Sequence, residues 1–184
     1  MVKNMTVPNI LSIFRILLVP VFVILVMSDM PNAYIYGMIV FVLAGATDVL
    51  DGKIARKYNC ISVLGKLLDP LADKLMVGAA LVCAGLLGLL PMFLPILYVV
   101  KEVLQCLGGV FLYKHIKDMI PSNVLGKAAT VFFFLMILAV YLIPGIPYTV
   151  KLVMALICTV FIAVTVIMYA TIAVRWLKAR PKEK

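Results

Sequence analysis

Long, nearly uninterrupted apolar segments are the feature that most constrains how this chain can fold. Of its 184 residues, 65% are hydrophobic and 14% are charged, whereas a water-soluble domain has about 45–50% apolar and about 25% charged residues. A helix that crosses a bilayer needs about 20 mainly apolar residues. The pattern therefore predicts an all-α integral membrane protein. Its six expected spans run approximately over residues 10–27, 33–54, 65–90, 94–113, 124–142 and 152–176.

We expect these spans to form one domain over residues 1–184, because six spans take up about 120 residues and leave only short connections. The segments SDMPN at 28–32 and IPGIPYT at 143–149 contain the proline, glycine and asparagine residues that are typical of turns. Arg15 interrupts the first apolar run early, and no convincing small-residue cleavage site follows it. We therefore interpret this run as a retained first helix and not as a signal peptide.

Lysine and arginine residues collect at alternate ends of the predicted spans. One side carries Lys3, Lys53, Arg56, Lys57, Lys66, Lys114, Lys117, Arg175, Lys178, Arg180, Lys182 and Lys184. Only Lys151 lies near the other side. Because positively charged loops favour the cytoplasmic side, we expect a bundle of six transmembrane helices in the cell (plasma) membrane, with both termini cytoplasmic. The net charge of +9 suits anionic lipid headgroups, and we expect no nucleic-acid binding because no soluble basic domain is present.

Residues 48–73, DVLDGKIARKYNCISVLGKLLDPLAD, contain four of the eight acidic residues: Asp48, Asp51, Asp69 and Asp73. Spacings of three and four place each pair on one face of a helix. Two unpaired carboxylates about 4 Å apart repel by about 4 kcal/mol at an effective dielectric of about 20. A divalent cation removes this repulsion, and an oxygen-only ligand set favours Mg²⁺, Mn²⁺ or Ca²⁺ over Zn²⁺. A salt-bridged polar rim is the alternative for each aspartate alone, but four together favour a metal site.

This stretch resembles the signature of the CDP-alcohol phosphotransferase family, D-x2-D-G-x2-A-R-x8-G-x3-D-x3-D. The eight fixed positions are filled, without departure, by Asp48, Asp51, Gly52, Ala55, Arg56, Gly65, Asp69 and Asp73. The segment PNILSIFR in the first span is similar to the family's P-N-x-L-T-x-x-R, with Ser12 in place of the commoner threonine. The resemblance covers most of the chain and implies a fold of six spans.

The resemblance also implies roles for individual residues. Asp48, Asp51 and Asp69 would bind two divalent ions, Mg²⁺ or Mn²⁺, with Asp73 near the metals and acting as general base on the acceptor hydroxyl. The positions implied to bind the CDP part are Asn9, Ser12, Gly52, Ala55, Arg56 and Gly65. Glycine and alanine would leave space for the nucleotide, and Arg56 would contact its diphosphate. A homodimer is the family habit.

The acceptor alcohol is expected to lie against residues of the fourth and fifth spans. Lys101 and Glu102 stand inside an apolar run, where ionisable residues usually face a bundle interior or a cavity. GKAAT at 126–130 resembles the G-K-x-x-T of members that use glycerol 3-phosphate, which makes Lys127 and Thr130 acceptor candidates. Those members usually carry Arg-Glu where this chain has Lys101-Glu102.

The resemblance implies transfer of the phosphatidyl group from CDP-diacylglycerol to glycerol 3-phosphate, with release of CMP. Transfer to phosphatidylglycerol, which makes cardiolipin, is the first alternative within the family, and inositol phosphate or serine as acceptor is a further one. A cation or proton transporter is an alternative from another class, but its carboxylates should lie near the middle of the membrane, whereas these lie at one interface. A lipid-binding or structural membrane protein would show no metal-dependent turnover.

Overall fold

The structure is a computed structural model that describes residues 7–58, 63–113 and 124–179. Side-chain surroundings are described for residues 11–47, 71–106, 108 and 128–171. The described chain is helical and contains no strand, which confirms the all-α prediction. Its six helices are α1 (Val7–Val26), α2 (Ala33–Tyr58), α3 (Val63–Leu86), α4 (Phe93–Tyr113), α5 (Val124–Leu142) and α6 (Tyr148–Ala179).

The helices match the predicted apolar segments, but several helix ends differ. The third helix ends at Leu86 and not near residue 90, because Gly88 adopts a left-handed conformation with φ of 68°. The amides of Leu89 and Leu90 then donate to the carbonyl of Ala84, at 2.8 and 3.2 Å, and so satisfy the helix end. The sixth helix begins at Tyr148, inside the predicted turn 143–149, and continues to Ala179.

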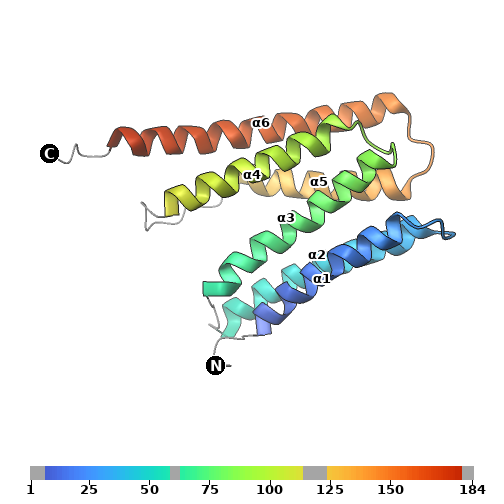
Figure 1. Cartoon of the computed structure of the whole chain (residues 1–184), viewed down its shortest axis with the longest axis horizontal. Helices are drawn as coiled ribbons and strands as arrows, with labels where there is room; N and C mark the ends of the chain where they lie inside the picture. Colours follow the sequence, from blue (N-terminus) through green and yellow to red (C-terminus); the bar gives the residue numbers. More distant parts are fainter. Residues whose placement is uncertain (1–6, 59–62, 114–123, 180–184) are drawn as a thin grey trace.

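The helices run up and down, and the turns at 27–32, 87–92 and 143–147 lie at one end of the molecule (Figure 1). The first residue of α1 and the last residue of α6 lie at the opposite end, as do the end of α2 and the start of α3. Helix α3 is central, since it contacts α1, α2, α4 and α5. This arrangement brings the two halves of the aspartate stretch to the end opposite the three turns.

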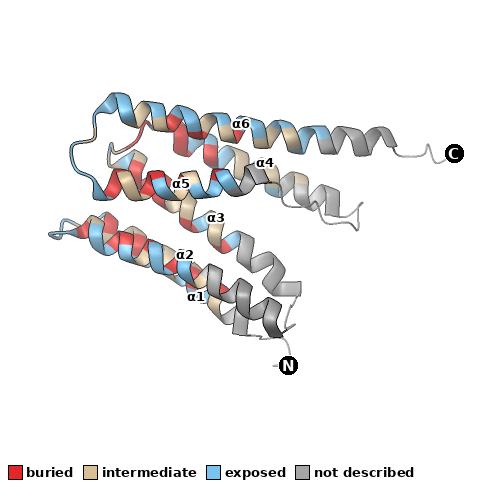
Figure 2. Cartoon of the chain, turned by 180° about the vertical axis from the view of Figure 1, so that it is seen from behind, coloured by how far each residue is buried: buried red, intermediate tan, exposed pale blue. Residues whose placement is uncertain are grey.

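The described buried side chains gather mainly toward the end that carries the three turns (Figure 2). An aromatic group there joins Phe22, Tyr34, Phe41 and Tyr141, with ring centroids 5.7 to 6.2 Å apart between neighbours. The hydroxyl of Tyr141 on α5 donates a hydrogen bond to the backbone carbonyl of Ala80 on α3, at 2.9 Å. These contacts fix α1, α2, α3 and α5 to one another at this end.

Apolar side chains also cover much of the outer surface. Ile24, Leu17 and Ile167 are each more than 60% exposed. Among the described residues, the segment Tyr148–Thr171 is long and apolar enough to cross a membrane, and shorter apolar helical stretches occur at Leu11–Val26, Ala33–Thr47 and Ala128–Leu142. A surface of this kind is typical of proteins that contact lipid or other apolar partners.

Candidate active site

Three helices carry the residues of the signature. Helix α1 contains Asn9, Ser12 and Arg15, α2 contains the aspartates at 48 and 51, and α3 contains those at 69 and 73. The three helices contact one another. The predicted site residues whose side chains lie outside the described ones are Asn9, Asp48, Asp51, Gly52, Ala55, Arg56, Gly65, Asp69 and Lys127. The fold therefore brings the helices of the signature together, and the ligand set as a whole stays a prediction.

Asp73 contacts a buried arginine. The Nη1 of Arg15 on α1 donates to the Oδ1 of Asp73 on α3 at 2.7 Å, across 58 residues of sequence. The side chain of Arg15 is 1% exposed and that of Asp73 is 46% exposed. A charge-assisted hydrogen bond of this kind stabilises the ionised carboxylate and orients it. Asp73 is thus a held, solvent-accessible carboxylate, which suits both a metal neighbour and a proton acceptor.

Ser12 is fully buried and lies one turn before Arg15 on the same face of α1. A buried hydroxyl and a buried guanidinium in an otherwise apolar helix give α1 one polar stripe. The sequence pattern predicted a place near the nucleotide for Ser12 but no role for Arg15. The signal that could have revealed Arg15 is its charge inside an apolar run, because such residues usually face a partner in the bundle.

The residues present fit a divalent-metal site by their chemistry. Of the predicted ligands, the structure describes the side chain of Asp73, whose partly exposed carboxylate offers oxygen to a hard cation. Within the described side chains, no group of three or more His, Cys, Asp and Glu residues could hold a metal. The other three predicted ligands lie on α2 and α3, which contact each other.

A second ion-pair group joins α3 to α4. The Nζ of Lys74 on α3 lies 2.6 Å from the Oε2 of Glu102 on α4, and the Nζ of Lys101 contacts the Oε1 of Glu102. The side chains of Lys101 and Glu102 are largely buried. The Lys101 ammonium also lies 5.4 Å from the ring centroid of Tyr98. The prediction that Lys101 and Glu102 face the bundle interior is therefore consistent with their burial, whereas Lys74 was missed.

Thr130 lies on α5 with an exposed side chain, and Lys127 lies one turn before it on the same helix. The structure therefore does not gather the three predicted acceptor residues into one described group. Lys101 has a defined environment, while Thr130 and Lys127 stay candidates on sequence grounds.

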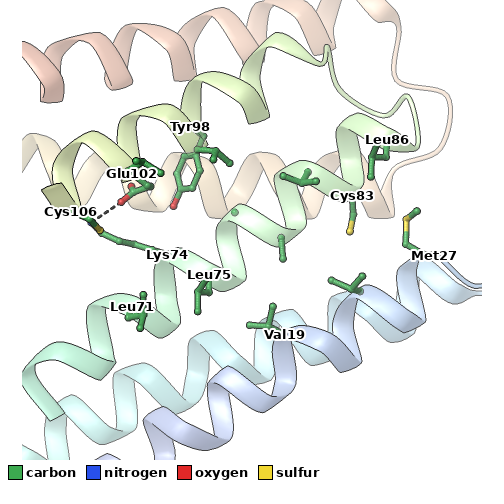
Figure 3. Close-up of a pocket in the computed structure, with 16 residues that line it drawn as sticks. Val19, Met27, Leu71, Lys74, Leu75, Cys83, Leu86, Tyr98, Glu102 and Cys106 are labelled. Carbon is green, nitrogen blue, oxygen red and sulfur yellow. Dashed lines mark ion pairs between the residues drawn. The ribbon is translucent and has the colours of Figure 1, made fainter. Parts of the chain in front are cut away.

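An apolar groove of about 670 Å³ runs between α1, α3 and α4 (Figure 3). Lys74 and Glu102 lie toward one end of it, and Met27 and Leu86 lie at the other end. Between them the lining is mostly aliphatic and includes Val19, Val23, Leu75, Val82 and Val99. Lys74, at the charged end of the groove, directly follows Asp73 in the sequence. The groove therefore begins beside the candidate site and extends away from it.

Comparison with known proteins supports the family resemblance of the signature. The sequence profile of the CDP-alcohol phosphatidyltransferase family matches residues 5–177. A Streptomyces coelicolor protein named cardiolipin synthase (CMP-forming) is 38% identical over 131 residues, which are 70% of this chain and 61% of that protein. A Bacillus subtilis protein named CDP-diacylglycerol–glycerol-3-phosphate 3-phosphatidyltransferase is 34% identical over 135 residues, 67% of this chain and 69% of its own. A Rickettsia bellii protein of that name is 48% identical over 75 residues, 41% of each chain.

Proteins of this family are associated with membranes, act on a CDP-alcohol and an acceptor alcohol, and generally depend on a divalent metal ion. The match covers nearly the whole chain, and the signature on α2 and α3 is complete. Together with the helical fold and the Arg15–Asp73 pair, these findings show that the chain belongs to the CDP-alcohol phosphatidyltransferase family.

Proposed function

We propose that this chain transfers the phosphatidyl group from CDP-diacylglycerol to glycerol 3-phosphate, giving phosphatidylglycerophosphate and CMP. The Bacillus and Rickettsia relatives carry the name of that activity. The observation that carries the proposal is the last signature aspartate, Asp73, held by buried Arg15 and still open to solvent. Removing the proton from the acceptor hydroxyl needs a carboxylate held in place, and Asp73 is the proposed residue.

On the donor side, Asp48, Asp51 and Asp69 would hold two divalent ions, Mg²⁺ or Mn²⁺, with Asp73 beside them. When bound, such ions neutralise the diphosphate and stabilise CMP as the leaving group. The support is the all-carboxylate donor set on two helices that contact each other. Asn9, Ser12, Gly52, Ala55, Arg56 and Gly65 would surround the CDP part.

Asp73 would act as the general base. An alcohol is a weak nucleophile until a positioned base takes its proton. The Arg15 hydrogen bond holds the Asp73 carboxylate in place, and an ionised carboxylate can accept a proton from the acceptor hydroxyl. The acceptor oxygen then bonds to the phosphorus that carries the lipid, and the bond to CMP breaks.

On the acceptor side, Lys101 would contact the phosphate of glycerol 3-phosphate, with Lys127 and Thr130 as further contacts. Lys101 is a largely buried cation that pairs with Glu102. Glu102 in turn pairs with Lys74, which follows Asp73 on α3. An ammonium in such a place favours an anionic group because water screens it little.

The membrane setting supports a lipid donor. Exposed apolar side chains cover the outside, and the aliphatic groove begins near Lys74 and Glu102. We infer that all six helices span the plasma membrane, that the active site and both termini face the cytoplasm, and that the chain forms a homodimer. The charge asymmetry of the loops and the exposed apolar faces of α3 and α4 support these assignments.

A cardiolipin synthase is the second candidate, because the Streptomyces relative of that name is 38% identical to this chain. Its acceptor, phosphatidylglycerol, is also an alcohol linked to a phosphate. The two candidates share the donor, the metals and the base, and they differ only at the acceptor.

The test is CMP release by the purified protein with CDP-diacylglycerol and a panel of acceptors. We expect release with glycerol 3-phosphate, dependence on Mg²⁺ or Mn²⁺, and loss of turnover after chelation that returning the ion restores. Release only with phosphatidylglycerol would establish the cardiolipin alternative. Absence of CMP release with every acceptor would instead favour a transporter or a non-catalytic lipid-binding protein.

A further inference from the structure

Two consecutive residues of α3 make ion pairs in different directions. Asp73 contacts Arg15 on α1, and Lys74 contacts Glu102 on α4. Consecutive side chains on a helix are separated by about 100° around its axis, so one turn of α3 can serve two neighbouring helices. The carboxylate proposed as the base and the lysine that reaches α4 are therefore fixed on the same rigid turn.

Glu102 joins two lysines from different helices. Its Oε2 pairs with Lys74 of α3 at 2.6 Å, and its Oε1 pairs with its chain neighbour Lys101. Figure 3 shows Lys74 extending from α3 to Glu102 on α4. Glu102 is 14% exposed and Lys101 is 16% exposed, so both ions have lost most of their water. Holding them there requires each to keep its partner.

The charge of this group matters for an anionic acceptor. Two ammonium groups and one carboxylate leave a net charge of +1. Lys74 offsets the charge of Glu102, so that Glu102 orients Lys101 without cancelling its attraction for a phosphate. A lysine ammonium has three N–H donors, and one bond to Glu102 leaves capacity for an incoming phosphate oxygen.

We propose that Glu102 is a positioning residue that fixes Lys101 for the phosphate of the acceptor and ties it, through Lys74, to the turn of α3 that carries Asp73. This inference rests on the proposed function, because it takes Lys101 to be the acceptor contact. It assigns a role in acceptor affinity to Glu102 and Lys74, neither of which is proposed to contact the CDP part, the metals or the acceptor.

A purely structural role for Glu102 makes a different prediction. If the carboxylate only holds α3 against α4, its loss lowers the amount of folded protein and leaves the kinetics of the folded fraction unchanged. If it positions Lys101, its loss weakens acceptor binding in correctly folded protein. The Michaelis constants of the two substrates separate these cases.

The experiment measures CMP release by wild-type protein and the Glu102→Gln variant while each substrate is varied in turn. We expect the KM for glycerol 3-phosphate to rise about tenfold or more, as for the loss of a charge-assisted contact. The KM for CDP-diacylglycerol should change less than about twofold, because the residues proposed to bind CDP and the metals lie on α1, α2 and α3, whereas Glu102 lies on α4. The Glu102→Asp variant keeps the charge and should recover part of the acceptor affinity.

A double-mutant cycle tests whether Glu102 acts through Lys101. Lys101→Met alone should raise the acceptor KM, and Glu102→Gln should then add less than about twofold on that background. Lys74→Met should also raise the acceptor KM, because the group then becomes neutral. Lys151→Met, on α6, is the matched control for loss of a half-buried lysine and should leave both constants unchanged.

Three outcomes overturn the inference: an unchanged acceptor KM in folded Glu102→Gln, an equal rise in both KM values, or fully additive effects with Lys101→Met. If Glu102→Gln does not fold, the KM values of Glu102→Asp decide by the same criterion. If the wild-type protein releases no CMP with glycerol 3-phosphate, the proposed function fails first. Activity of the wild-type protein therefore separates the two failures.

Discussion

At the scale of single residues, the pair formed by Arg15 and Asp73 is the most informative contact of the candidate site. The guanidinium is buried, and the carboxylate that it contacts is not. A guanidinium has five donors in a rigid fork, so its burial beside Asp73 fixes the direction from which the carboxylate can accept a proton. The side chain of Asp73 remains 46% exposed, which leaves it accessible to a substrate.

Replacing Asp73 with asparagine should abolish CMP release. Asparagine keeps the size of the side chain but cannot accept the proton of the acceptor hydroxyl, and a positioned base contributes about 10²- to 10⁴-fold to a rate. The measurement is the turnover number of protein whose fold is checked by thermal unfolding. Asp29→Asn, in the exposed turn at the opposite end, is the matched control. Normal turnover in Asp73→Asn would show that another group is the base.

Arg15→Lys should lower the turnover number by about tenfold while the charge is retained. Lysine cannot reproduce the planar fork of arginine, so Asp73 would be held less firmly. The measurement is the turnover number at saturating substrates, together with the thermal midpoint of unfolding. Full turnover in folded Arg15→Lys would mean that Asp73 does not depend on the guanidinium geometry.

At the scale of helices, the close approach of α1 and α2 depends on the absence of a side chain at Gly37. A Cβ built at this position would overlap the Cγ2 of buried Val26. Valine is β-branched and cannot turn away easily. Small residues at helix contacts let two backbones approach closely, as is common in membrane proteins.

Gly37→Ala should therefore lower the thermal midpoint by several degrees, since overpacking costs about 1–3 kcal/mol. Gly108→Ala is the matched control, because no described atom lies within 4 Å of the added methyl group. Alanine is also the better helix former, so this control should be neutral or slightly stabilising. Equal midpoints for the two variants would mean that α1 can shift at little cost.

At the scale of the whole molecule, the alternation of turns and charged loops predicts how the protein is oriented in the membrane. The three short turns share one end, and the sequence places 12 of the 17 lysines and arginines near the other, with only Lys151 near the turns. This predicts that the turn end faces away from the cytoplasm.

Single cysteines test this orientation in a variant that lacks the four native cysteines. A membrane-impermeant maleimide applied to intact cells should label a cysteine at position 29. It should label a cysteine at position 117 only after the membrane is permeabilised. Detergent-solubilised protein, in which both positions react, is the control, and the reverse pattern would overturn the proposed topology.

The sequence predicted the number and place of the helices because apolar runs and turn residues report them directly. It did not predict that α3 stops at Leu86, since the left-handed Gly88 depends on local geometry. It identified Asp73 through a local signature. It could not pair Asp73 with Arg15 or Glu102 with Lys74, because contacts across 58 and 28 residues depend on how each helix is rotated in the packed bundle.

The placement of Asp73 and Lys74 on one turn of α3 has a thermodynamic consequence. Any rotation of α3 that changes the contact with α1 also changes the contact with α4. We therefore expect the binding of CMP and the binding of the acceptor to be linked. The acceptor should change the dissociation constant of CMP by the same factor as CMP changes the dissociation constant of the acceptor. Calorimetric titration of CMP with and without glycerol 3-phosphate measures this factor, and identical constants would show that α3 transmits no coupling.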